Sequence, residues 1–254
     1  MFFDTHLHVH YPDFDVDRAE SLARARGEGI HAFLNVGTDV ASSRTSIQLA
    51  ESSPDIWAAC GIHPNDTRDT TPEDLQQIEA MLSHPRVAAV GEVGLDFYRE
   101  HSPRETQRRI FSEFLKMAQR HDKPLVIHCR DAYEALIDML KEHRSENPRG
   151  IIHCFSADRP VMEQLAALGF YISFAGPLTY KKNDGLREAC RACPRDKLLL
   201  ETDAPFLPPQ SQRGKRNEPS LMLETARTMA ELHGLELRAL GDLTSANARA
   251  VLGL

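Results

Sequence analysis

The chain has 254 residues and a formal net charge of −7, so it lacks the global basic field that concentrates proteins on duplex DNA. No apolar run approaches the roughly 20 residues that span a bilayer, and no basic start with a long apolar core opens the chain. We therefore expect a cytoplasmic protein with no membrane partner, in which one large core is buried.

Eight short apolar runs follow one another along the chain, with their ends roughly thirty residues apart, the length of a strand and a returning helix. They predict strands at Phe2–Thr5, Ala32–Val36, Ile56–Gly61, Val87–Gly91, Leu125–Ile127, Gly150–Ile152, Phe170–Phe174 and Leu198–Glu201. Eight β-α units in a chain of this length predict a (β/α)8 TIM barrel. Since no linker or low-complexity tract interrupts it, we expect one domain over residues 1–254.

Helix-type segments separate these runs. Seven of them are Asp17–Glu28, Ala41–Glu51, Glu134–His143, Arg159–Leu168, Asp184–Cys193, Ser220–His233 and Leu237–Leu252. Ser102-Pro103-Arg104-Glu105 and Thr71-Pro72-Glu73-Asp74 have the pattern of a capping box with proline in the first helical position. Asp131, directly after the fifth run, is expected to cap the next helix.

Ligand-type side chains gather at the ends of the predicted strands. His6 and His8 are two apart, which places them on one face of a strand, whereas on a helix they would diverge. Glu92, His128, His153 and Asp203 each end an apolar run. A single histidine at the end of an apolar run is more often a core residue whose ring nitrogens are hydrogen-bonded. Chance burial does not, however, predict that five of the eight runs end in imidazole or carboxylate. This pattern favours a metal-dependent enzyme.

Two further segments allow more than one interpretation. The polar, proline-rich stretch of residues 208–219 follows the eighth predicted strand, and in a barrel we expect it to be a lid or a substrate contact. The five cysteines fit a reducing compartment. Cys129 and Cys154 are expected to be core thiols. Cys190 and Cys193 have ligand-like spacing, but a closed zinc site usually needs four protein ligands, so we expect a structural or incidental role.

Several motifs together resemble the TatD family of metal-dependent hydrolases, within the amidohydrolase superfamily, from residue 2 to about 250. They are Asp4-Thr-His6-Leu-His8, Gly61-Ile-His63-Pro64, Gly91-Glu92-Val-Gly94-Leu-Asp96, Ile127-His128-Cys-Arg130-Asp131, His153-Cys-Phe155, Glu201-Thr-Asp203-Ala-Pro205 and Arg213-Gly-Lys215-Arg-Asn217-Glu-Pro219. The resemblance implies a barrel with two divalent metal ions that hydrolyses phosphodiester bonds of DNA.

The resemblance also implies a ligand set. His6, His8 and Asp203 would bind one metal ion, His128 and His153 the other, and Glu92 would bridge them. His10 departs from the family pattern, and we expect it to be a rim residue. Four imidazoles favour zinc, manganese, cobalt or iron over magnesium, although the family leaves magnesium possible.

Catalytic roles follow from charge. Two divalent ions with only Glu92 and Asp203 as counter-charges leave a positive centre that favours an anion. Asp203 is expected to accept the proton of the attacking water, with Glu92 holding the cluster together. His63 is expected to orient substrate or act as a general acid, unless it caps a helix or packs in the core.

Substrate contacts are expected from cations and aromatic rings at the same rim. Arg130 is expected to hold a phosphate, because its planar fork matches two oxygens, unless it pairs with Glu201 or another carboxylate. Arg213 and Lys215 are further candidates. The others are Arg216, Lys181, Lys182 and Arg99 among the cations, and Phe97, Tyr98, Phe155 and Tyr180 as rings on which bases could stack. Core packing is the default expectation for Phe97 and Phe155.

The leading hypothesis is a 3′-to-5′ exonuclease acting on DNA ends, with single-stranded DNA the favoured partner and no obligate protein partner. Alternatives keep the metals but hydrolyse a carbonyl ester, amide, lactone or aminoacyl ester. A Schiff-base lyase is disfavoured, because Lys123 and Lys197 precede their strands and so lie at the opposite face. Outside enzymes, a metal-binding scaffold would have closed coordination and no activity.

Overall fold

The computed structural model describes residues 1–99, 101–144 and 147–254. Its strands are β1 (Phe2–Leu7), β2 (Ile30–Val36), β3 (Ile56–Cys60), β4 (Val87–Asp96), β5 (Leu125–Arg130), β6 (Gly150–Ile152), β7 (Tyr171–Phe174) and β8 (Leu198–Leu200). Its α-helices are α1 (Arg18–Gly27), α2 (Val40–Ser52), α3 (Pro72–Met81), α4 (Arg104–Arg120), α5 (Tyr133–Glu142), α6 (Arg159–Ala167), α7 (Asp184–Ala192), α8 (Met222–His233) and α9 (Leu237–Leu252). Short 3₁₀ helices include η1 (Pro12–Phe14), η2 (Pro64–Asp69), η4 (Gly176–Thr179), η5 (Arg195–Lys197), η6 (Gln210–Gln212) and η7 (Pro219–Leu221).

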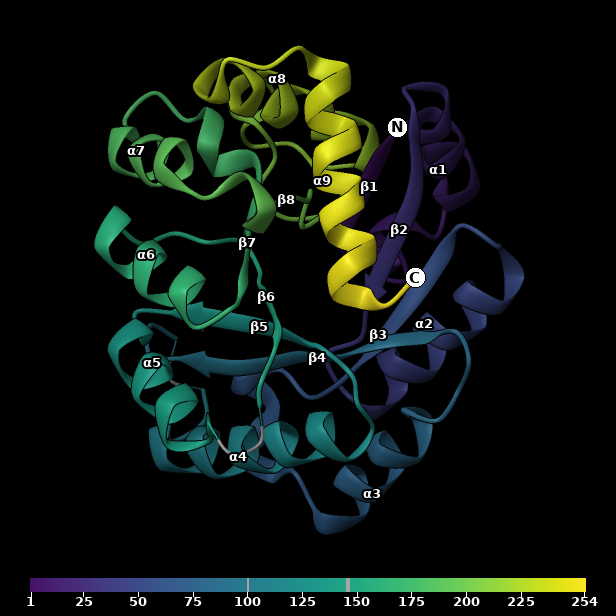
Figure 1. Ribbon diagram of the computed structural model, residues 1–254. Helices are drawn as coiled ribbons and strands as arrows, with labels where there is room; N and C mark the ends of the chain where they lie inside the picture. The colour runs from purple at the N-terminus through teal and green to yellow at the C-terminus, as the bar shows by residue number, and fades with distance from the viewer. Residues whose placement is uncertain (100, 145–146) are drawn as a thin grey trace. The chain divides into compact units, whose positions relative to one another are not determined.

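The strands form one parallel sheet in the order β1 to β8 (Figure 1). Beyond β1 and β8, Leu7 pairs in parallel with Ala204, so the first strand also neighbours the last. This order is that of a TIM-barrel-like α/β fold, and the predicted (β/α)8 class is confirmed.

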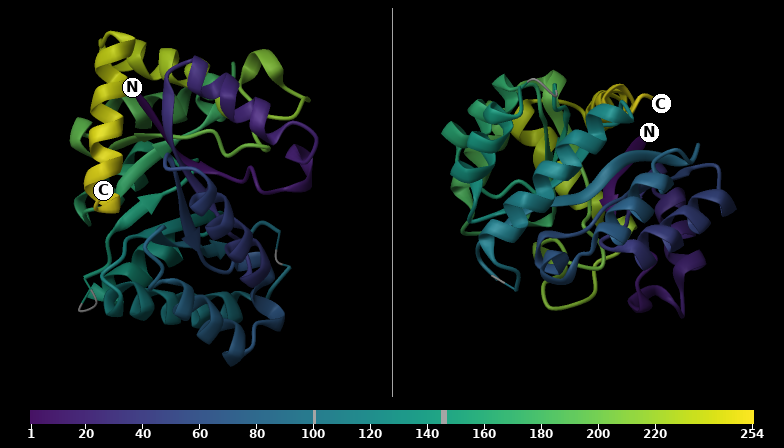
Figure 2. Two further views of the ribbon diagram at one scale, coloured as in Figure 1. Left: turned by 90° about the vertical axis from the view of Figure 1, so that its right-hand side faces the viewer. Right: turned by 90° about the horizontal axis from the view of Figure 1, so that it is seen from below.

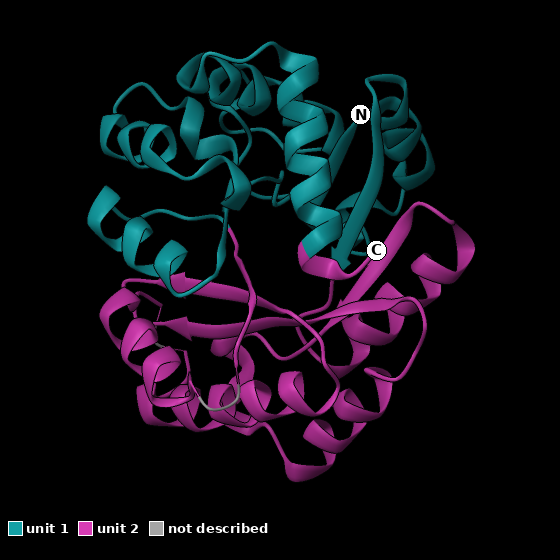
Figure 3. Ribbon diagram, in the orientation of Figure 1, with its two compact units in different colours: residues 1–35, 154–250 teal, residues 36–153, 251–254 magenta. Residues whose placement is uncertain are grey.

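The chain divides into two compact units (Figure 3). Unit 1 comprises residues 1–35 and 154–250, and unit 2 comprises residues 36–153 and 251–254. In unit 2, α2 packs on β3 and α4 packs on β4. In unit 1, α8 packs on η4 and β8, and the amino group of Met1 lies 3.0 Å from Asp242 Oδ1 on α9, beside which the N-terminus is visible in Figure 2.

Burial explains why the apolar runs become strands. All ten residues of β4 and all six of β1 are buried, as expected for parallel strands that are covered on both faces. On α4 the buried side chains recur with helical spacing, as in Ile110, Phe114 and Ala118. Within the described ranges, no helix combines the length and the apolar character needed to traverse a bilayer.

Of the three predicted caps, one is confirmed. Thr71 and Asp74 form the capping box of α3. Ser102 does not cap α4, whose N-cap is Pro103, because the Ser102 hydroxyl is buried and holds η2 instead: it accepts from the Arg68 N–H and donates to the Asn65 carbonyl. Asp131 does not cap α5, because the chain takes a left-handed turn there (φ 51°) and Ala132 becomes the N-cap.

The fourth strand is longer than the apolar run that predicted it. Pairing with β5 continues beyond Gly91 to Gly94, opposite His128, and to Asp96, opposite Arg130. Glu92 therefore lies within β4 and not at its end, which corrects the sequence interpretation. The extension matters because Glu92, Gly94 and Asp96 alternate along one strand and so share a face.

Candidate metal centres

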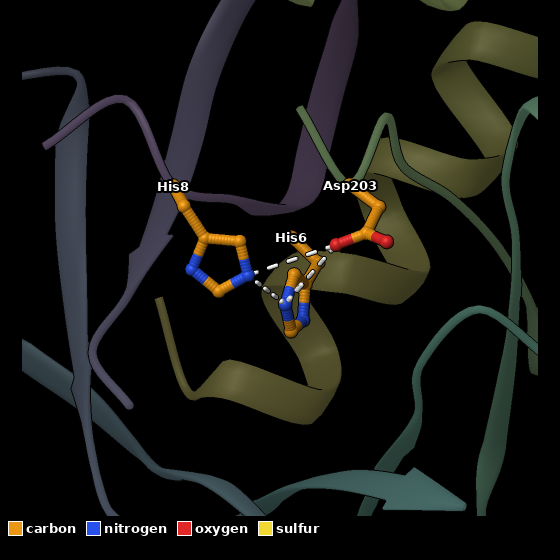
Figure 4. Close-up of side chains that lie close together, drawn as sticks. All are labelled: His6, His8 and Asp203. Atoms are coloured by element: carbon orange, nitrogen blue, oxygen red, sulfur yellow. Dashed lines mark hydrogen bonds and ion pairs between the residues drawn. The ribbon is translucent and has the colours of Figure 1, made fainter. Parts of the chain in front are cut away.

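The first cluster consists of His6, His8 and Asp203, all in unit 1 and all buried. His6 lies on β1, His8 directly follows it, and Asp203 follows β8. Figure 4 shows the two rings and the carboxylate pointing toward one another. His6 Nε2 and His8 Nε2 are 3.1 Å apart, and Asp203 Oδ1 is 3.8 Å and 3.6 Å from them, respectively. The i, i+2 prediction for the histidine pair is thus met by the geometry.

Backbone contacts fix this arrangement. The Asp203 N–H donates to the His6 carbonyl (2.9 Å), and the His8 N–H donates to the Ala204 carbonyl (2.7 Å). Asp203 adopts a left-handed conformation (φ 59°), which is uncommon for a residue other than glycine and is typical of functional positions.

Asp4 supports the first cluster from inside the core. Its carboxylate accepts from the Thr202 N–H (2.9 Å) and hydroxyl (2.6 Å), and more weakly from the His6 N–H (3.3 Å). Burial raises the pKa of Asp4 to about 8 despite these bonds. Asp4 therefore links β1 to the segment after β8, and these are the parts of the chain that provide the first cluster.

The second cluster consists of His63, Glu92, His128 and His153, all in unit 2. Three imidazole nitrogens surround one carboxylate oxygen: Glu92 Oε1 is 2.9 Å from His128 Nδ1, 3.1 Å from His153 Nε2 and 3.6 Å from His63 Nε2. His153 Nε2 and His128 Nδ1 are 3.4 Å apart. The residues come from β4, β5 and the segments after β3 and β6.

Gly94 allows β4 and β5 to approach at this point. Its φ is 138°, and a Cβ there would fall 2.1 Å from the His128 carbonyl oxygen. No residue with a side chain would fit without moving the backbone that carries His128.

Asp96 holds the other side of the His128 ring. Asp96 Oδ2 is 3.2 Å from His128 Nε2 and accepts from Asn65 Nδ2, while Oδ1 accepts from the Tyr98 and Arg99 N–H groups. Burial opposes ionisation of Asp96, but the hydrogen bonds from His128, Arg99 and Asn65 outweigh it and lower its pKa. An ionised carboxylate only accepts, so His128 Nε2 carries a hydrogen toward Asp96, while Nδ1 faces Glu92. Although burial opposes the charged ring, its hydrogen bonds to Asp96 and Glu92 raise the pKa of His128.

His63 differs from the other histidines of the second cluster. Its Nδ1 accepts from the Asn65 N–H (3.1 Å), so His63 caps η2, as the alternative interpretation held. Burial, aided by the neighbouring His128, lowers the pKa of His63 to about 3. The neutral ring then carries its hydrogen on Nε2, which lies 3.6 Å from Glu92 Oε1, beyond hydrogen-bond distance, and can donate to a bound group.

Both clusters fit a divalent ion. Ligand atoms about 2.0–2.2 Å from a tetrahedral ion lie about 3.4 Å from each other, and the separations of 3.1–3.8 Å in the first cluster match this. In the second cluster the candidate ligand atoms of Glu92, His128 and His153 lie 2.9–3.4 Å from one another. Imidazole nitrogen and carboxylate oxygen are ligands of zinc, manganese, cobalt and iron.

Two of the predicted substrate-binding arginines stack on tyrosines. Arg130 Cζ lies 3.7 Å from the centre of the Tyr98 ring in unit 2, and Arg213 Cζ lies 4.4 Å from the Tyr180 ring in unit 1. A guanidinium on an aromatic face keeps its hydrogen-bonding edge available to an anion. Lys215 is exposed, with Nζ donating to Gln212.

Arg216 has a structural role in place of the expected nucleic-acid contact. Its guanidinium makes a two-point ion pair with Asp17 (2.7 Å each) and donates to the Asp13 carbonyl. Asn217 Nδ2 donates to the Thr202 and Phe206 carbonyls. The 208–219 stretch is thus anchored to its own unit, which favours a fixed substrate contact over a lid.

Two of the four rings proposed to stack bases are packed against protein. Phe155 is buried at 1% exposure and meets Phe174 edge-on, and Phe97 is half-buried under Arg104. Core packing was the default expectation for both, and it is confirmed for Phe155, whereas Tyr98 is exposed.

The remaining expectations concern His10 and the cysteines. β1 ends at Leu7, and His10 lies beyond it, buried, with Nδ1 3.0 Å from Asn35 Nδ2. Cys129 is buried as expected, but Cys154 is half-buried in a left-handed turn and its N–H donates to Glu201. Cys190 and Cys193 are buried, and Cys190 Sγ lies 4.0 Å from His233 Nε2.

Sequence reasoning gave no role to Asp96, Tyr11 or Phe206. Asp96 belongs to one of the family motifs. If the predicted strand had been continued past Gly91, the spacing of four residues would have placed Asp96 on the same face as Glu92. For Tyr11 and Phe206, no local pattern indicated that they meet beside the first cluster.

Comparison with known proteins agrees with this geometry. The profile of the family described as "TatD related DNase" matches residues 3–253. The "Uncharacterized metal-dependent hydrolase YabD" of Bacillus subtilis is 38% identical over 249 residues, covering 98% of both chains. The "3'-5' ssDNA/RNA exonuclease TatD" of Klebsiella pneumoniae is 33% identical over 257 residues, covering 99% of this chain and 98% of that one.

A solved structure shows the same fold. The TatD homologue YJJV from Escherichia coli superposes with a TM-score of 0.94 at 29% identity, covering 100% of this chain and 98% of the other. The predicted class, a metal-dependent hydrolase, is also supported by these relatives. The chain belongs to the TatD-related DNase family.

Proposed function

We propose that this protein is a metal-dependent 3′-to-5′ exonuclease that hydrolyses phosphodiester bonds at the ends of single-stranded nucleic acid. The observation that carries the proposal is the pair of buried histidine–carboxylate clusters, each with ligand spacing for a divalent ion. Support for the substrate comes from relatives at 33–34% identity, which are named 3′-5′ ssDNA/RNA exonucleases.

We assign one divalent ion to each cluster. His6, His8 and Asp203 hold the first, and Glu92, His128 and His153 hold the second, with the bridging role of Glu92 remaining a prediction. The bound ions would supply Lewis-acid activation of water and of the scissile phosphate. Each cluster sets one carboxylate against one divalent ion, so each keeps a positive charge that attracts an anion.

The side chains of the chain itself provide the proton transfers and the orientation. Asp203 accepts the proton of the attacking water, since its carboxylate is 3.6–3.8 Å from both imidazoles and its strained backbone holds it in place. Glu92 Oε1 lies among three imidazole nitrogens and orients them. His63, neutral with its hydrogen on Nε2, donates to a substrate oxygen. Arg130 and Arg213 hold phosphates.

The test is a substrate panel with purified protein: end-labelled single-stranded DNA and RNA with the label at either end, bis-p-nitrophenyl phosphate, and amide, lactone and aminoacyl ester substrates. We expect stepwise shortening from the 3′ end, loss of activity on chelation and recovery on metal add-back. Turnover of carbonyl substrates with no phosphodiester cleavage would contradict the proposal, as would full activity in the chelator.

Asp203→Asn separates binding from catalysis. It keeps one oxygen near His6 and His8 but removes the proton acceptor, so we expect a loss of kcat of about 10²–10⁴-fold, the usual contribution of a general base. Asp69→Asn, an exposed carboxylate on η2, is the matched control. Equal activity of the two variants would remove Asp203 from its assigned role.

A further inference from the structure

Two aromatic rings without a part in the proton transfers lie beside the first cluster. Tyr11 stacks on His8, with ring centroids 5.0 Å apart and an interplanar angle of 13°. Phe206 stands edge-on to both, 5.9 Å from Tyr11 at 77° and 6.0 Å from His8 at 66°. All three belong to unit 1. We call Tyr11 and Phe206 the aromatic platform.

The platform offers apolar surface to solvent. Phe206 is 48% exposed, and its neighbour Leu207 is 39% exposed. Large apolar side chains that stay in water side by side next to a candidate site are typical of ligand contacts, whereas scattered single ones are not.

The backbone under Phe206 is fixed, so its exposure does not come from a loose loop. The Phe206 N–H donates to the Asp203 carbonyl (2.8 Å), and its carbonyl accepts from Asn217 Nδ2 (2.7 Å). Leu207 adopts φ 49°, a conformation that a leucine rarely takes and that persists only where the surroundings impose it. Gly176 packs against this segment so closely that a Cβ there would lie 2.1 Å from the Leu207 carbonyl oxygen.

We propose that the aromatic platform is the subsite for the nucleobase of the nucleotide whose phosphate is bound at the first cluster. The inference rests on the proposed function. Phe206 is hydrogen-bonded through its backbone to Asp203, so a base stacked on its ring stays close to a phosphate held by the cluster. Every base has a π face, so this contact tolerates any sequence and requires an unpaired end.

The exposed ring of the platform, Phe206, offers no hydrogen-bonding group to read base edges. Phe206 and Leu207 present only carbon to solvent, so a base stacked on Phe206 is held as a planar ring and not by its identity. A substrate without bases near its end is therefore the sharpest probe, because it retains the phosphates and removes only the stacking partner.

The experiment compares a single-stranded oligonucleotide with the same oligonucleotide whose three 3′-terminal nucleotides are abasic. For the wild-type protein we expect KM to be about 5- to 100-fold lower on the intact oligonucleotide, the usual value of stacking one base on an aromatic ring. Phe206→Ala should raise KM on the intact substrate alone and bring this ratio close to one, with kcat little changed. Phe206→Trp should restore the ratio.

Val16→Ala is the matched control, since Val16 is 90% exposed and takes no part in the platform. A wild-type ratio of one, a ratio unchanged in Phe206→Ala, or a ratio lost equally in Val16→Ala would overturn the inference. The melting temperature of each variant confirms that it is folded.

A binding arm distinguishes this inference from the proposed function. Fluorescence anisotropy measures Kd for both oligonucleotides, made with terminal phosphorothioate linkages that are hydrolysed slowly. If the wild-type protein cleaves neither substrate, the proposed function fails, and the Kd ratio alone decides the platform. A Kd ratio above one that Phe206→Ala abolishes supports the subsite; equal binding of both oligonucleotides, or binding of neither, overturns it.

Discussion

Asp96→Asn tests whether a carboxylate outside the ligand set prepares His128 for a metal ion. In the wild-type protein Asp96 Oδ2, 3.2 Å from His128 Nε2, keeps the hydrogen of the ring on Nε2 and leaves Nδ1 toward Glu92. Asparagine can still accept from the Tyr98 and Arg99 N–H groups through its oxygen. Its NH₂ group then faces His128 Nε2 and stabilises the opposite tautomer, with hydrogen on Nδ1.

The substitution changes two bonds to Oδ2, those from Asn65 Nδ2 and from His128 Nε2, and the effect on metal binding follows from the one to His128. A hydrogen bond to a charged group contributes about 1.5–3 kcal/mol, which corresponds to about 10- to 100-fold in affinity. The same range is typical of partners that orient metal-binding histidines. We therefore expect one metal ion to bind about 10- to 100-fold more weakly in Asp96→Asn.

The assay is a competitive titration of Zn²⁺ between the metal-free protein and a chromogenic chelator. Because Asp96 belongs to the second cluster, only one of two binding steps should weaken. Asp69→Asn should leave both steps unchanged. Weakening of neither step in Asp96→Asn would refute the argument about the tautomer.

Three further changes probe the fold around the clusters. Gly94→Ala should lower the free energy of unfolding by about 1–3 kcal/mol in urea titrations, since its Cβ would meet the His128 carbonyl at 2.1 Å; an unchanged midpoint would contradict the close approach. Phe155→Ala should lower the free energy of unfolding by about 3–5 kcal/mol, because it truncates a buried core side chain. The ratio of KM on the abasic substrate to KM on the intact one should stay as in the wild type, and a changed ratio would show that Phe155 contacts substrate. Asp17→Asn should lower the melting temperature by a few degrees at pH 7, since an ion pair of this exposure contributes about 1 kcal/mol. The hydrogen bonds from Arg216 and Arg24 lower the pKa of Asp17 to about 2. This stabilisation is therefore present above about pH 4 and lost as the pH falls toward 2, so the melting temperatures of the wild type and the variant should converge there. A difference in melting temperature that stays constant with pH would exclude the ion pair as the source of the stabilisation.

The sequence alone determined the order of β-α units and the residues that could bind metal. Both are local signals: an apolar run followed by imidazole or carboxylate needs only a few neighbouring residues to be recognised. The parallel arrangement adds the rest, because strand ends of one polarity share an edge, so His6 and Asp203 were expected at the same rim although almost the whole chain separates them. The resemblance to a known family supplied the assignment of ligands to two ions.

Only the tertiary structure decided which polar and aromatic groups serve the site and which serve the fold. Arg216 was a candidate for nucleic-acid binding until its partner Asp17, 199 residues away, was known. Phe155 and Phe206 both follow strand ends, yet one is buried at 1% and the other is 48% exposed. The physical reason is that burial and ion pairing depend on which distant segments pack together, and neither hydrophobic periodicity nor residue spacing carries that information.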